Sequence, residues 1–474
     1  MVFTTIADGL ARGVEGVSST VSETFFEPVI RLGVTGLARS GKTVFITSLV
    51  ANLLDRGRMP QLTAAANGAI RTAYLQPQPD DTIPRFPFEA NLAALTGASP
   101  RWPEPTSAVS ELRLSLKVQP QGMLGALSGP RTIHLDIIDY PGEWLLDLAL
   151  LDKDYDGWAA EALARLDTRP MGRAFADLAA RTDPAAEFDE PLAQRLAESY
   201  TAYLQEARAA GYSDCTPGRF LLPGEMAGSP VLTFAPLPPV AAGARTGRGA
   251  LRREMARRFD AYKREVVKPF FRDHFARIDR QVVLVDALGA IHAGPPALED
   301  LRATLAEILT AFRPGRNSWL SSILGRRVER ILFAATKADH LHHAQHARLT
   351  GIMEALVRDA RSRADFAGAR TEAMSIASLR TTVEDTITHE GHPLEVVRGT
   401  LLDGGRRAAF YPGELPVDPA VLLAPAREGA PRWLDGDYGA MHFAPAPLTL
   451  RRDEGPPHIR LDRAAEFLIG DRLK

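Results

Sequence analysis

The segment from Gly36 to Thr43 constrains the fold of this chain more than any other feature. It reads GLARSGKT, with two glycines, a lysine and a threonine at the spacing of a Walker A phosphate-binding loop. The apolar run Arg31–Thr35 predicts a buried strand before the loop, and the pattern Thr43–Leu54 predicts a helix after it. Because a phosphate loop requires that context, we expect a P-loop fold that binds a nucleotide.

Each residue type in this loop has a chemical role. Glycines let backbone N–H groups turn toward phosphate oxygens, Lys42 reaches the β- and γ-phosphates and contributes to catalysis, and the Thr43 hydroxyl is a ligand for Mg²⁺. Arg39 could act as an arginine finger in cis, although an arginine in such a loop is more often solvent-facing or structural. The expected nucleotide contacts are Gly36, Ala38, Arg39, Ser40, Gly41, Lys42, Thr43 and Val44.

Six short apolar runs predict buried strands, and helical patterns follow several of them. This order predicts an α/β fold of three layers, in which helices cover both faces of a mostly parallel sheet. Such sheets bind ligands at the carboxyl ends of their strands. The expected strands are Arg31–Thr35, Val109–Val118, Ile133–Ile138, Gln281–Asp286, Arg330–Ala335 and Glu372–Ile376, and the clearest helices are Thr43–Leu54, Pro296–Phe312 and His340–Ala360.

A second motif follows the third expected strand, where Asp139-Tyr-Pro-Gly142 forms a DxxG element. In this arrangement Asp139 binds Mg²⁺ through a water molecule, and the Gly142 amide approaches the γ-phosphate. DxxG alone is a weak signal. Its position at the carboxyl end of a buried strand, after the half of the domain that holds the phosphate loop, strengthens the prediction.

A third motif follows the fifth expected strand, where Thr336-Lys-Ala-Asp339 matches the [NT]KxD element that reads guanine. The aspartate accepts two hydrogen bonds from the N1 and N2 edge of the base, and the stem of Lys337 packs on the ring. Adenine offers no such donor pair, so Asp339 favours GTP over ATP. The alternative is that Asp339 only caps the helix expected from His340.

Two weaker assignments complete the expected site. Ser375, Ile376 and Ala377, at the end of the last strand, resemble the loose SA[KL] element whose backbone touches the base. The switch I threonine that completes the Mg²⁺ site should precede the second strand. Thr82 and Thr106 are the candidates, and we favour Thr106 because it lies just before that strand. The Pro-rich segment that contains both threonines is expected to be irregular.

The remaining segments extend this nucleotide-binding domain. Apolar spacing predicts an amphipathic helix at the N-terminus, helices over 155–167, 171–182 and 191–209, a basic helix after a Gly/Pro-rich stretch, a β meander over Thr381–Pro419 and a docking helix over Leu461–Leu473. The expected units are 1–28 (N-terminal helix), 29–143 (first half of the domain), 144–280 (helical insertion), 281–380 (second half) and 381–474 (meander and docking segment).

Composition restricts the partners and the compartment. The net charge of -2 gives no general attraction for nucleic acid, so no nucleic-acid partner is expected. Cys215 is the only cysteine, which excludes an intramolecular disulfide and favours a reducing compartment. No apolar run reaches the length of a membrane span and no secretory signal opens the chain, so we expect a cytoplasmic protein.

A group of histidines follows Asp339. His340, His342, His343 and His346 lie close together in the sequence, and His342 and His346 would share one face of a helix at the spacing of a metal site. Without a third ligand we interpret this group as part of a surface helix.

Taken together, these strings resemble the YcjX-like P-loop GTPases of bacteria. The resemblance rests on GLARSGKT, DYPGEW from Asp139, TKAD, IPRFPFE from Ile83 and HIRLDRAAEFLIGD from His458, and it spans nearly the whole chain. It implies a Ras-like G domain with helical additions, whose second strand runs antiparallel to the first and third. It also implies a cytoplasmic stress-associated protein, peripheral to the inner membrane if it binds a membrane-protein partner.

One residue departs from the pattern of efficient Ras-like enzymes, which carry glutamine after the DxxG glycine to orient the attacking water. This position holds Glu143, whose carboxylate can accept a hydrogen bond from water but repels the γ-phosphate. We therefore expect a slow GTPase switch with GTP or GDP and Mg²⁺ as cofactors. The alternatives are a nucleotide-stabilised interaction module at a membrane protein without meaningful hydrolysis, and a P-loop ATPase. The oligomeric state stays open.

Overall fold

The computed structural model describes residues 27–37, 39–104, 108–120, 129–241, 247–273, 275–311, 328–358, 368–433 and 438–474. The expected N-terminal helix, Ala38 and Thr106 lie outside these residues.

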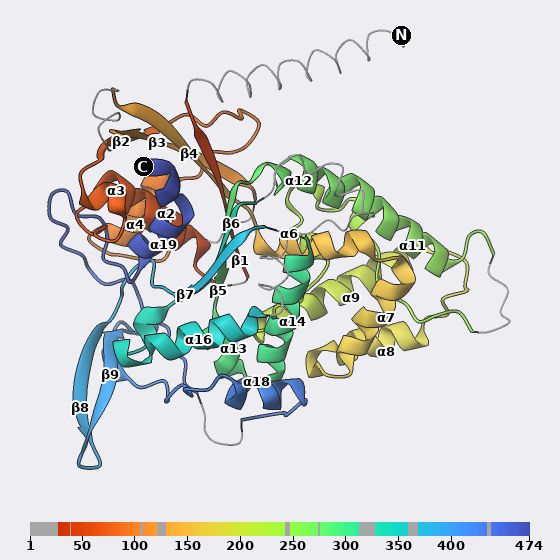
Figure 1. Cartoon of the computed structure of the whole chain (residues 1–474). Helices are drawn as coiled ribbons and strands as arrows, with labels where there is room; N and C mark the ends of the chain where they lie inside the picture. Colours follow the sequence, from red (N-terminus) through yellow and green to blue (C-terminus); the bar gives the residue numbers. More distant parts are fainter. Residues whose placement is uncertain are drawn as a thin grey trace, which may run out of the picture.

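A seven-stranded sheet forms the centre of the molecule (Figure 1). Its order is β2-β3-β4-β1-β5-β6-β7, and the pairs from β4 to β7 are all parallel. β3 runs antiparallel to both of its neighbours, as expected for the second strand of a Ras-like sheet. The strands are β1 (Val29–Gly36), β2 (Ile70–Gln76), β3 (Ser110–Val118), β4 (Arg131–Asp139), β5 (Arg280–Val285), β6 (Arg330–Ala335) and β7 (Arg370–Ser375).

The central strands are buried on both faces, which explains their continuous apolar runs. In β5, Val283 and Val285 belong to one hydrophobic cluster, whereas Val282 and Leu284 belong to a second cluster on the opposite face. The second cluster contains α2 (Lys42–Leu54), α3 (Thr63–Ala66), α4 (Phe88–Thr96) and α19 (Leu461–Ile469), and the first contains α6 (Gly142–Leu146), α13 (Ala287–Ala293), α14 (Pro295–Ala311) and α16 (His346–Leu356). The three-layer prediction is confirmed, and Figure 1 shows the two groups of helices on opposite sides of the sheet.

The prediction of an irregular segment before β3 was wrong. This segment contains the edge strand β2 as well as the helices α3 and α4. An edge strand has a neighbour on one side only, and most of β2 is exposed or half-buried, so it shows no continuous apolar run. The composition of β2 therefore did not distinguish this strand from a loop.

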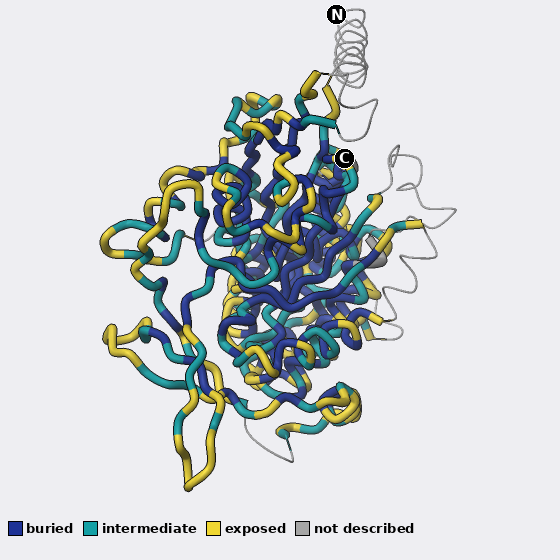
Figure 2. Tube along the Cα trace, turned by 60° about the vertical axis from the view of Figure 1, so that its left-hand side comes forward, coloured by how far each residue is buried: buried dark blue, intermediate teal, exposed yellow. Residues whose placement is uncertain are grey.

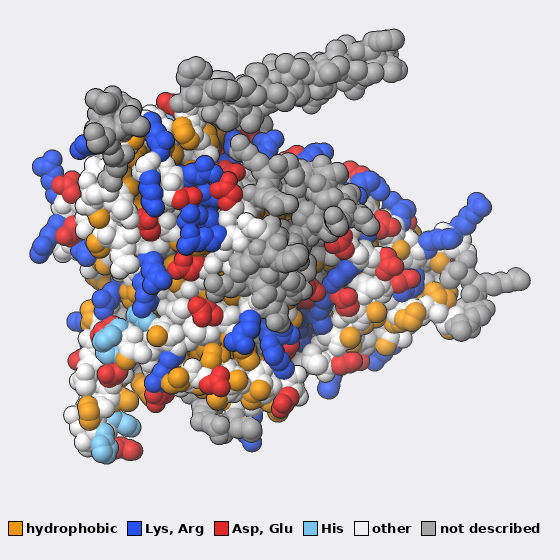
Figure 3. Space-filling view, viewed as in Figure 1, with side chains coloured by type: hydrophobic (Ala, Val, Ile, Leu, Met, Phe, Trp, Pro, Cys, Tyr) orange, Lys and Arg blue, Asp and Glu red, His pale blue; other side chains and the backbone are white. Residues whose placement is uncertain are grey.

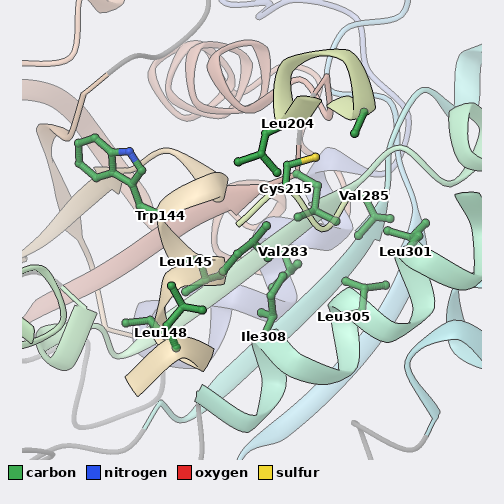
Figure 4. Packing of buried hydrophobic residues seen from close by; sticks show 14 of the residues in the cluster. Trp144, Leu145, Leu148, Leu204, Cys215, Val283, Val285, Leu301, Leu305 and Ile308 are labelled. Atoms are coloured by element: carbon green, nitrogen blue, oxygen red, sulfur yellow. The ribbon is translucent and has the colours of Figure 1, made fainter. Parts of the chain in front are cut away.

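Between β4 and β5 the chain is mainly helical. Its helices are α7 (Tyr155–Leu166), α8 (Arg173–Arg181), α9 (Glu190–Ala209), α10 (Gly218–Leu221), α11 (Leu251–Tyr262) and α12 (Lys268–Asp273), with a π-helical turn, η5 (Lys263–Val267), between the last two. Figure 4 shows that they share a core with the sheet, because Leu204 and Cys215 lie beside Val283, Val285 and the α14 leucines. The helices are thus packed on the sheet through one apolar cluster.

The C-terminal part contains the expected small sheet and docking helix. β8 (Val383–His389), β9 (His392–Thr400) and β10 (Arg407–Phe410) form an antiparallel meander, followed by α18 (Ala420–Arg427). The β8–β9 hairpin projects from the body with an exposed tip, whereas the second half of β9 is buried or half-buried (Figure 2). Helix α19 and the turn η9 (Gly470–Leu473) return to the central sheet and bury Leu461 and Leu468 against it.

In the part of the chain that the structure describes, no helix is both long enough and apolar enough to cross a lipid bilayer.

Candidate nucleotide-binding site

The loop between β1 and α2 has the backbone of an anion-binding turn. Arg39 and Gly41 adopt left-handed conformations, with φ angles of 63° and 80°. The Ser40 amide donates to the Leu37 carbonyl at 3.1 Å, which closes the turn. No side chain among the described residues caps the N-terminus of α2, and its first turn carries no acidic residue. The amides of this turn and the helix dipole therefore favour a bound phosphate at this end.

A cavity of about 520 Å³ opens in front of this loop. It lies at the carboxyl ends of the parallel strands, where a sheet of this kind binds ligands. Of the residues predicted from the sequence, the cavity is lined by Gly36, Arg39, Ser40, Gly41, Lys42, Thr43, Val44, Glu143, Thr336, Lys337, Asp339 and Ala377. The phosphate-binding and base-reading motifs thus share one cavity.

The DxxG element packs directly on the phosphate loop. Lys42 Nζ lies 3.3 Å from Asp139 Oδ1, and the Asp139 side chain is almost completely buried. A Cβ atom on Gly142 would lie 2.0 Å from the carbonyl oxygen of Gly36, so only glycine allows this approach. The backbone after β4 is therefore held against the end of β1 that carries the loop.

The donor set at this end of the cavity fits Mg²⁺. Thr43 lines the cavity and offers a hydroxyl, and Asp139, which is buried behind Lys42 and is not part of the lining, offers a carboxylate; these are the hard oxygen ligands that this ion prefers. In addition, the buried hydroxyl of Ser40 has no hydrogen-bond partner among the described residues, as expected for a group that faces a ligand. Thr82, the weaker switch I candidate, is exposed, binds Asp80 through its hydroxyl and does not line the cavity.

Asp339 lies in the 3₁₀ turn η7 (Ala338–His340) and is almost fully buried at the other end of the cavity. Its Oδ2 atom accepts hydrogen bonds from the Thr381 amide at 2.9 Å and from the Thr381 hydroxyl at 2.7 Å. The alternative role as a helix cap is wrong, because α16 begins only at His346 and the bonded donor belongs to a distant segment. The predicted helix over His340–Ala360 likewise begins too early.

The two residues beside Asp339 are held in defined positions. Lys337 has a left-handed backbone with φ of 60°, and its ammonium group forms an ion pair with Asp286 at the end of β5. Thr336 donates its amide to the Val285 carbonyl at 2.9 Å, which aligns the ends of β5 and β6. Both residues line the cavity.

The element after β7 contributes to the cavity at a different point from the one expected. Ser375 is buried and donates its hydroxyl to the His346 carbonyl, and Ile376 belongs to the core, so neither side chain lines the cavity. The chain reaches the cavity from Ala377 onward, through Ser378 and Leu379. β7 ends at Ser375, so the residues that reach the cavity lie two positions later in the sequence than the predicted Ser375–Ala377 element.

The cavity also has lining residues that the sequence did not indicate. Trp102 and Pro103 come from the segment before β3, and Leu402, His442 and Phe443 come from the C-terminal part. The Trp102 indole N–H donates to the Phe443 carbonyl at 2.9 Å, and the Phe443 ring packs edge-on against His340. These segments close the side of the cavity near Asp339. No local pattern marks them, because their contacts join distant parts of the chain.

Glu143 is paired with a residue of α9. Arg208 Nη2 lies 2.6 Å from Glu143 Oε1, and both side chains line the cavity. Gly218 packs on the same turn, since a Cβ atom there would lie 2.1 Å from the Glu143 carbonyl oxygen. The carboxylate predicted to face the γ-phosphate is therefore neutralised by a cation from the segment between β4 and β5.

The interpretation of these histidines as part of a surface helix is wrong for His346, and His342 does not share a helix face with it. His346 is buried, its Nε2 atom lies 2.8 Å from the Ala338 carbonyl, and its ring supports the turn that carries Asp339. His342 precedes α16 and points elsewhere, because the two 3₁₀ turns η7 and η8 (His343–Gln345) replace the expected first turns of the helix.

Comparison with known proteins agrees with this geometry. A model of the YcjX-like family (DUF463) matches residues 30–473. A protein of Escherichia coli named Ras-like GTPase YcjX is 37% identical over 460 residues, which cover 94% of this chain and 96% of that protein. Its namesake from Shewanella oneidensis is 34% identical over 472 residues, which cover 94% and 95% of the two chains.

Proposed function

This chain belongs to the YcjX-like family, and from that membership and the geometry of its cavity we propose that it binds guanine nucleotides with Mg²⁺ and hydrolyses GTP slowly. The observation that carries the proposal is that a phosphate loop and a guanine-reading motif line the same cavity of about 520 Å³. The relatives named Ras-like GTPase support it.

At the phosphate end, the amides of the loop and of the first turn of α2 would bind the β-phosphate. Lys42 Nζ lies 3.3 Å from Asp139 Oδ1. When a nucleotide binds, this ammonium group would move from Asp139 to the β- and γ-phosphates. In the transition state Lys42 and the loop amides would stabilise the charge that develops on the phosphate oxygens. Arg39 lines the cavity and adds a further positive charge.

Thr43 and Asp139 are the described residues that would hold Mg²⁺, the latter through water, and Thr106 stays our proposal for the third protein ligand. When bound, the ion neutralises charge on the β- and γ-phosphates. The burial of Asp139 beside Lys42 keeps its carboxylate in a fixed position near the loop.

At the base end, Thr381 fixes the Asp339 carboxylate through two hydrogen bonds to one of its oxygens. A carboxylate held in this way can accept from the N1 and N2 donors of guanine without paying for reorientation. Adenine presents no such donors, so an adenine nucleotide would leave the buried Asp339 carboxylate without a hydrogen bond from the base. Lys337, held by Asp286, would cover one face of the ring.

We further propose that Arg208 and Glu143 make the insertion, residues 144–280, sensitive to the nucleotide. A γ-phosphate entering the cavity would compete with Glu143 for the Arg208 guanidinium, and that competition would move α9. Glu143 in place of glutamine supports slow turnover. A stress-related role, a cytoplasmic location and a membrane-protein partner are proposals that follow from the family resemblance.

Nucleotide-dependent melting with Mg²⁺ tests the binding proposal. GDP and GTP should raise the melting temperature of the wild type, since a ligand at a hundred times its Kd adds about 2.7 kcal/mol of stability, and ATP should have little effect. Lys42→Ala should reduce the effect of both guanine nucleotides, and Asp339→Ala should reduce the preference for guanine. Lys117→Ala, which changes an exposed side chain of β3, is the control. An unchanged guanine preference in Asp339→Ala would contradict the assignment.

A second candidate function is a nucleotide-stabilised interaction module without meaningful hydrolysis. The ion pair between Glu143 and Arg208 favours it, because Glu143 would have to leave Arg208 before it could position a water molecule. Phosphate release from GTP, measured under single-turnover conditions, separates the two functions. Slow release that is lost in Lys42→Ala supports a GTPase, whereas tight binding with no release supports the module.

A further inference from the structure

Two histidines and a glutamate meet outside the nucleotide cavity, where the loop after Asp339 contacts the start of β8. His342, His343 and Glu384 each offer a ligand atom, and these atoms lie within 4.8 Å of one another. Figure 3 shows histidine side chains at the root and near the tip of the projecting β8–β9 hairpin. None of these residues lines the nucleotide cavity.

The spacing of the ligand atoms suits a small tetrahedral ion. Glu384 Oε2 lies 2.8 Å from His343 Nδ1 and 3.7 Å from His342 Nε2. Metal–ligand bonds of ~2.0–2.1 Å in a tetrahedron separate neighbouring ligand atoms by about 3.3 Å, which lies between these two values. The third separation, between the two imidazole nitrogens, is at most 4.8 Å, so rotation of the histidine side chains would bring the three atoms to bonding distance of one ion.

The surrounding contacts orient each ligand. The second carboxylate oxygen of Glu384, Oε1, accepts from the His343 amide at 3.1 Å, which leaves Oε2 facing the imidazoles. The second ring nitrogen of His342, Nδ1, lies 3.1 Å from Glu395 Oε2 on the neighbouring strand β9 and, at the longer distance of 3.4 Å, near the Ala344 amide. A carboxylate on the outer nitrogen of a histidine is the usual support of a metal-binding imidazole, because it fixes the tautomer and raises the basicity of the ligand.

We propose that His342, His343 and Glu384 bind a divalent transition-metal ion of the zinc type, supported by Glu395. Two imidazoles and one carboxylate suit Zn²⁺ and not Mg²⁺, which prefers oxygen ligands alone. His343 is 69% exposed, so the fourth coordination position is accessible to water or to a ligand from a partner. His342 is only 10% exposed, so its side of the site is shielded from solvent.

The position of the site gives it a structural consequence. His342 follows Asp339 closely in the sequence, and Glu384 follows Thr381, the residue that fixes the Asp339 carboxylate. A bound ion would cross-link these two segments on the outer side of the Asp339–Thr381 contact. This consequence for the nucleotide rests on the proposed function, whereas metal binding itself does not.

Titration of the full chain with Zn²⁺ tests the proposal, with Mg²⁺ and GDP in excess to occupy the nucleotide cavity. Calorimetry should give one site in the wild type. His343→Ala and Glu384→Gln should each weaken Zn²⁺ binding by at least about 10-fold, and Glu395→Gln by roughly 10- to 100-fold, the usual effect of losing an outer partner. His389→Ala/His392→Ala, which removes two exposed histidines at the tip of the same hairpin, is the matched control.

Co²⁺ absorption adds a readout of geometry, because tetrahedral and octahedral sites differ in spectrum. A tetrahedral spectrum lost in His343→Ala but kept in the control supports the site. Equal Zn²⁺ affinity in all variants, or loss in the control alone, overturns it. Release of labelled GDP with and without Zn²⁺ then tests the cross-link. If Zn²⁺ binds but GDP release is unchanged, the result supports the metal site and contradicts its coupling to Asp339.

Discussion

Arg208 Nη2 lies 2.6 Å from Glu143 Oε1, and the two residues come from elements that only the fold brings together. Glu143 directly follows the DxxG glycine at the end of β4, whereas Arg208 belongs to the last turn of α9. Glu143 is buried, so its charge is neutralised mainly by this one cation. The electrostatics of the cavity beside Glu143 therefore depend on the position of α9.

Substitution of Arg208 and substitution of Glu143 should shift the preference for GTP over GDP in opposite directions. Arg208→Ala leaves a buried carboxylate that repels the γ-phosphate, so the preference for GTP should fall. Glu143→Gln frees Arg208 for the phosphate, so the preference should rise. A coupling of about 1 kcal/mol corresponds to roughly fivefold in each ratio of dissociation constants. Competition binding against a labelled nucleotide gives these ratios.

The double variant and a surface control complete this experiment. If the pair is coupled, the effects of the two single changes will not add in Arg208→Ala/Glu143→Gln, and additivity within about 0.5 kcal/mol would speak against the coupling. Arg195→Ala removes an exposed arginine from the same helix and should leave the ratio unchanged.

Thr381→Val should weaken guanine nucleotides without reversing the preference for guanine. The change removes the hydroxyl hydrogen bond to Asp339 Oδ2 and keeps the bond from the amide. Loss of one hydrogen bond to a charged acceptor costs about 1.5–3 kcal/mol, so the GDP affinity should fall at least about tenfold. Equilibrium binding of GDP and ADP measures both effects. Thr388→Val, an exposed position on β8, should bind GDP like the wild type.

The phosphate loop, Asp139 and Asp339 could be predicted because each belongs to a short contiguous motif. The strand before each motif fixes the end of the sheet at which it lies, so the order of the strands alone brings the three together. The same reasoning found β1 and β3 to β7, each of which carries several buried apolar residues.

The residues that were missed depend on contacts between distant segments. Phe443 reaches the cavity because it packs into the space left by Gly399, where a Cβ atom would lie 2.5 Å from its ring. Arg208 looks like any charged residue near the end of an amphipathic helix, and its partner is set by how α9 packs on the sheet. Neither relationship leaves a periodic or local signal in the sequence.

Asp147 should make the stability of the protein fall between about pH 4 and pH 7. Burial raises the pKa of this carboxyl to about 7, against the lowering effect of hydrogen bonds from Tyr262 and Gly218. In this window the folded state holds a proton that the unfolded state has released, so unfolding becomes easier as the pH rises. The loss should be about 2 kcal/mol between pH 5 and pH 7.

Denaturant unfolding of the wild type and of Asp147→Asn at pH 5 and pH 8 measures this effect. Asparagine cannot ionise and keeps an acceptor for the Gly218 amide. As the pH rises, the unfolding free energy of Asp147→Asn should therefore increase relative to that of the wild type. Asp177→Asn, an exposed carboxylate on α8, controls for the change of net charge. Parallel pH profiles of wild type and Asp147→Asn would exclude Asp147 as the source.

Trp102→Phe should speed the release of GDP. Trp102 lines the cavity near Asp339, and its indole N–H donates to the Phe443 carbonyl at 2.9 Å, so it ties the segment before β3 to the C-terminal part. Phenylalanine keeps most of the apolar contact but removes this donor. Loss of a hydrogen bond worth about 1 kcal/mol should raise the dissociation rate roughly fivefold, with little change in the association rate. Stopped-flow release of a fluorescent GDP analogue measures both rates.

Trp433→Phe is the matched control for this change. Trp433 also donates its indole N–H to a backbone carbonyl, that of Ile291 at 2.8 Å, but it does not line the cavity. Its loss should therefore lower stability to a similar extent while leaving GDP release unchanged. If both variants release GDP at the wild-type rate, the contact between Trp102 and Phe443 does not retain the nucleotide. If both release it faster, the effect reflects general loosening of the fold and not the closure of this cavity.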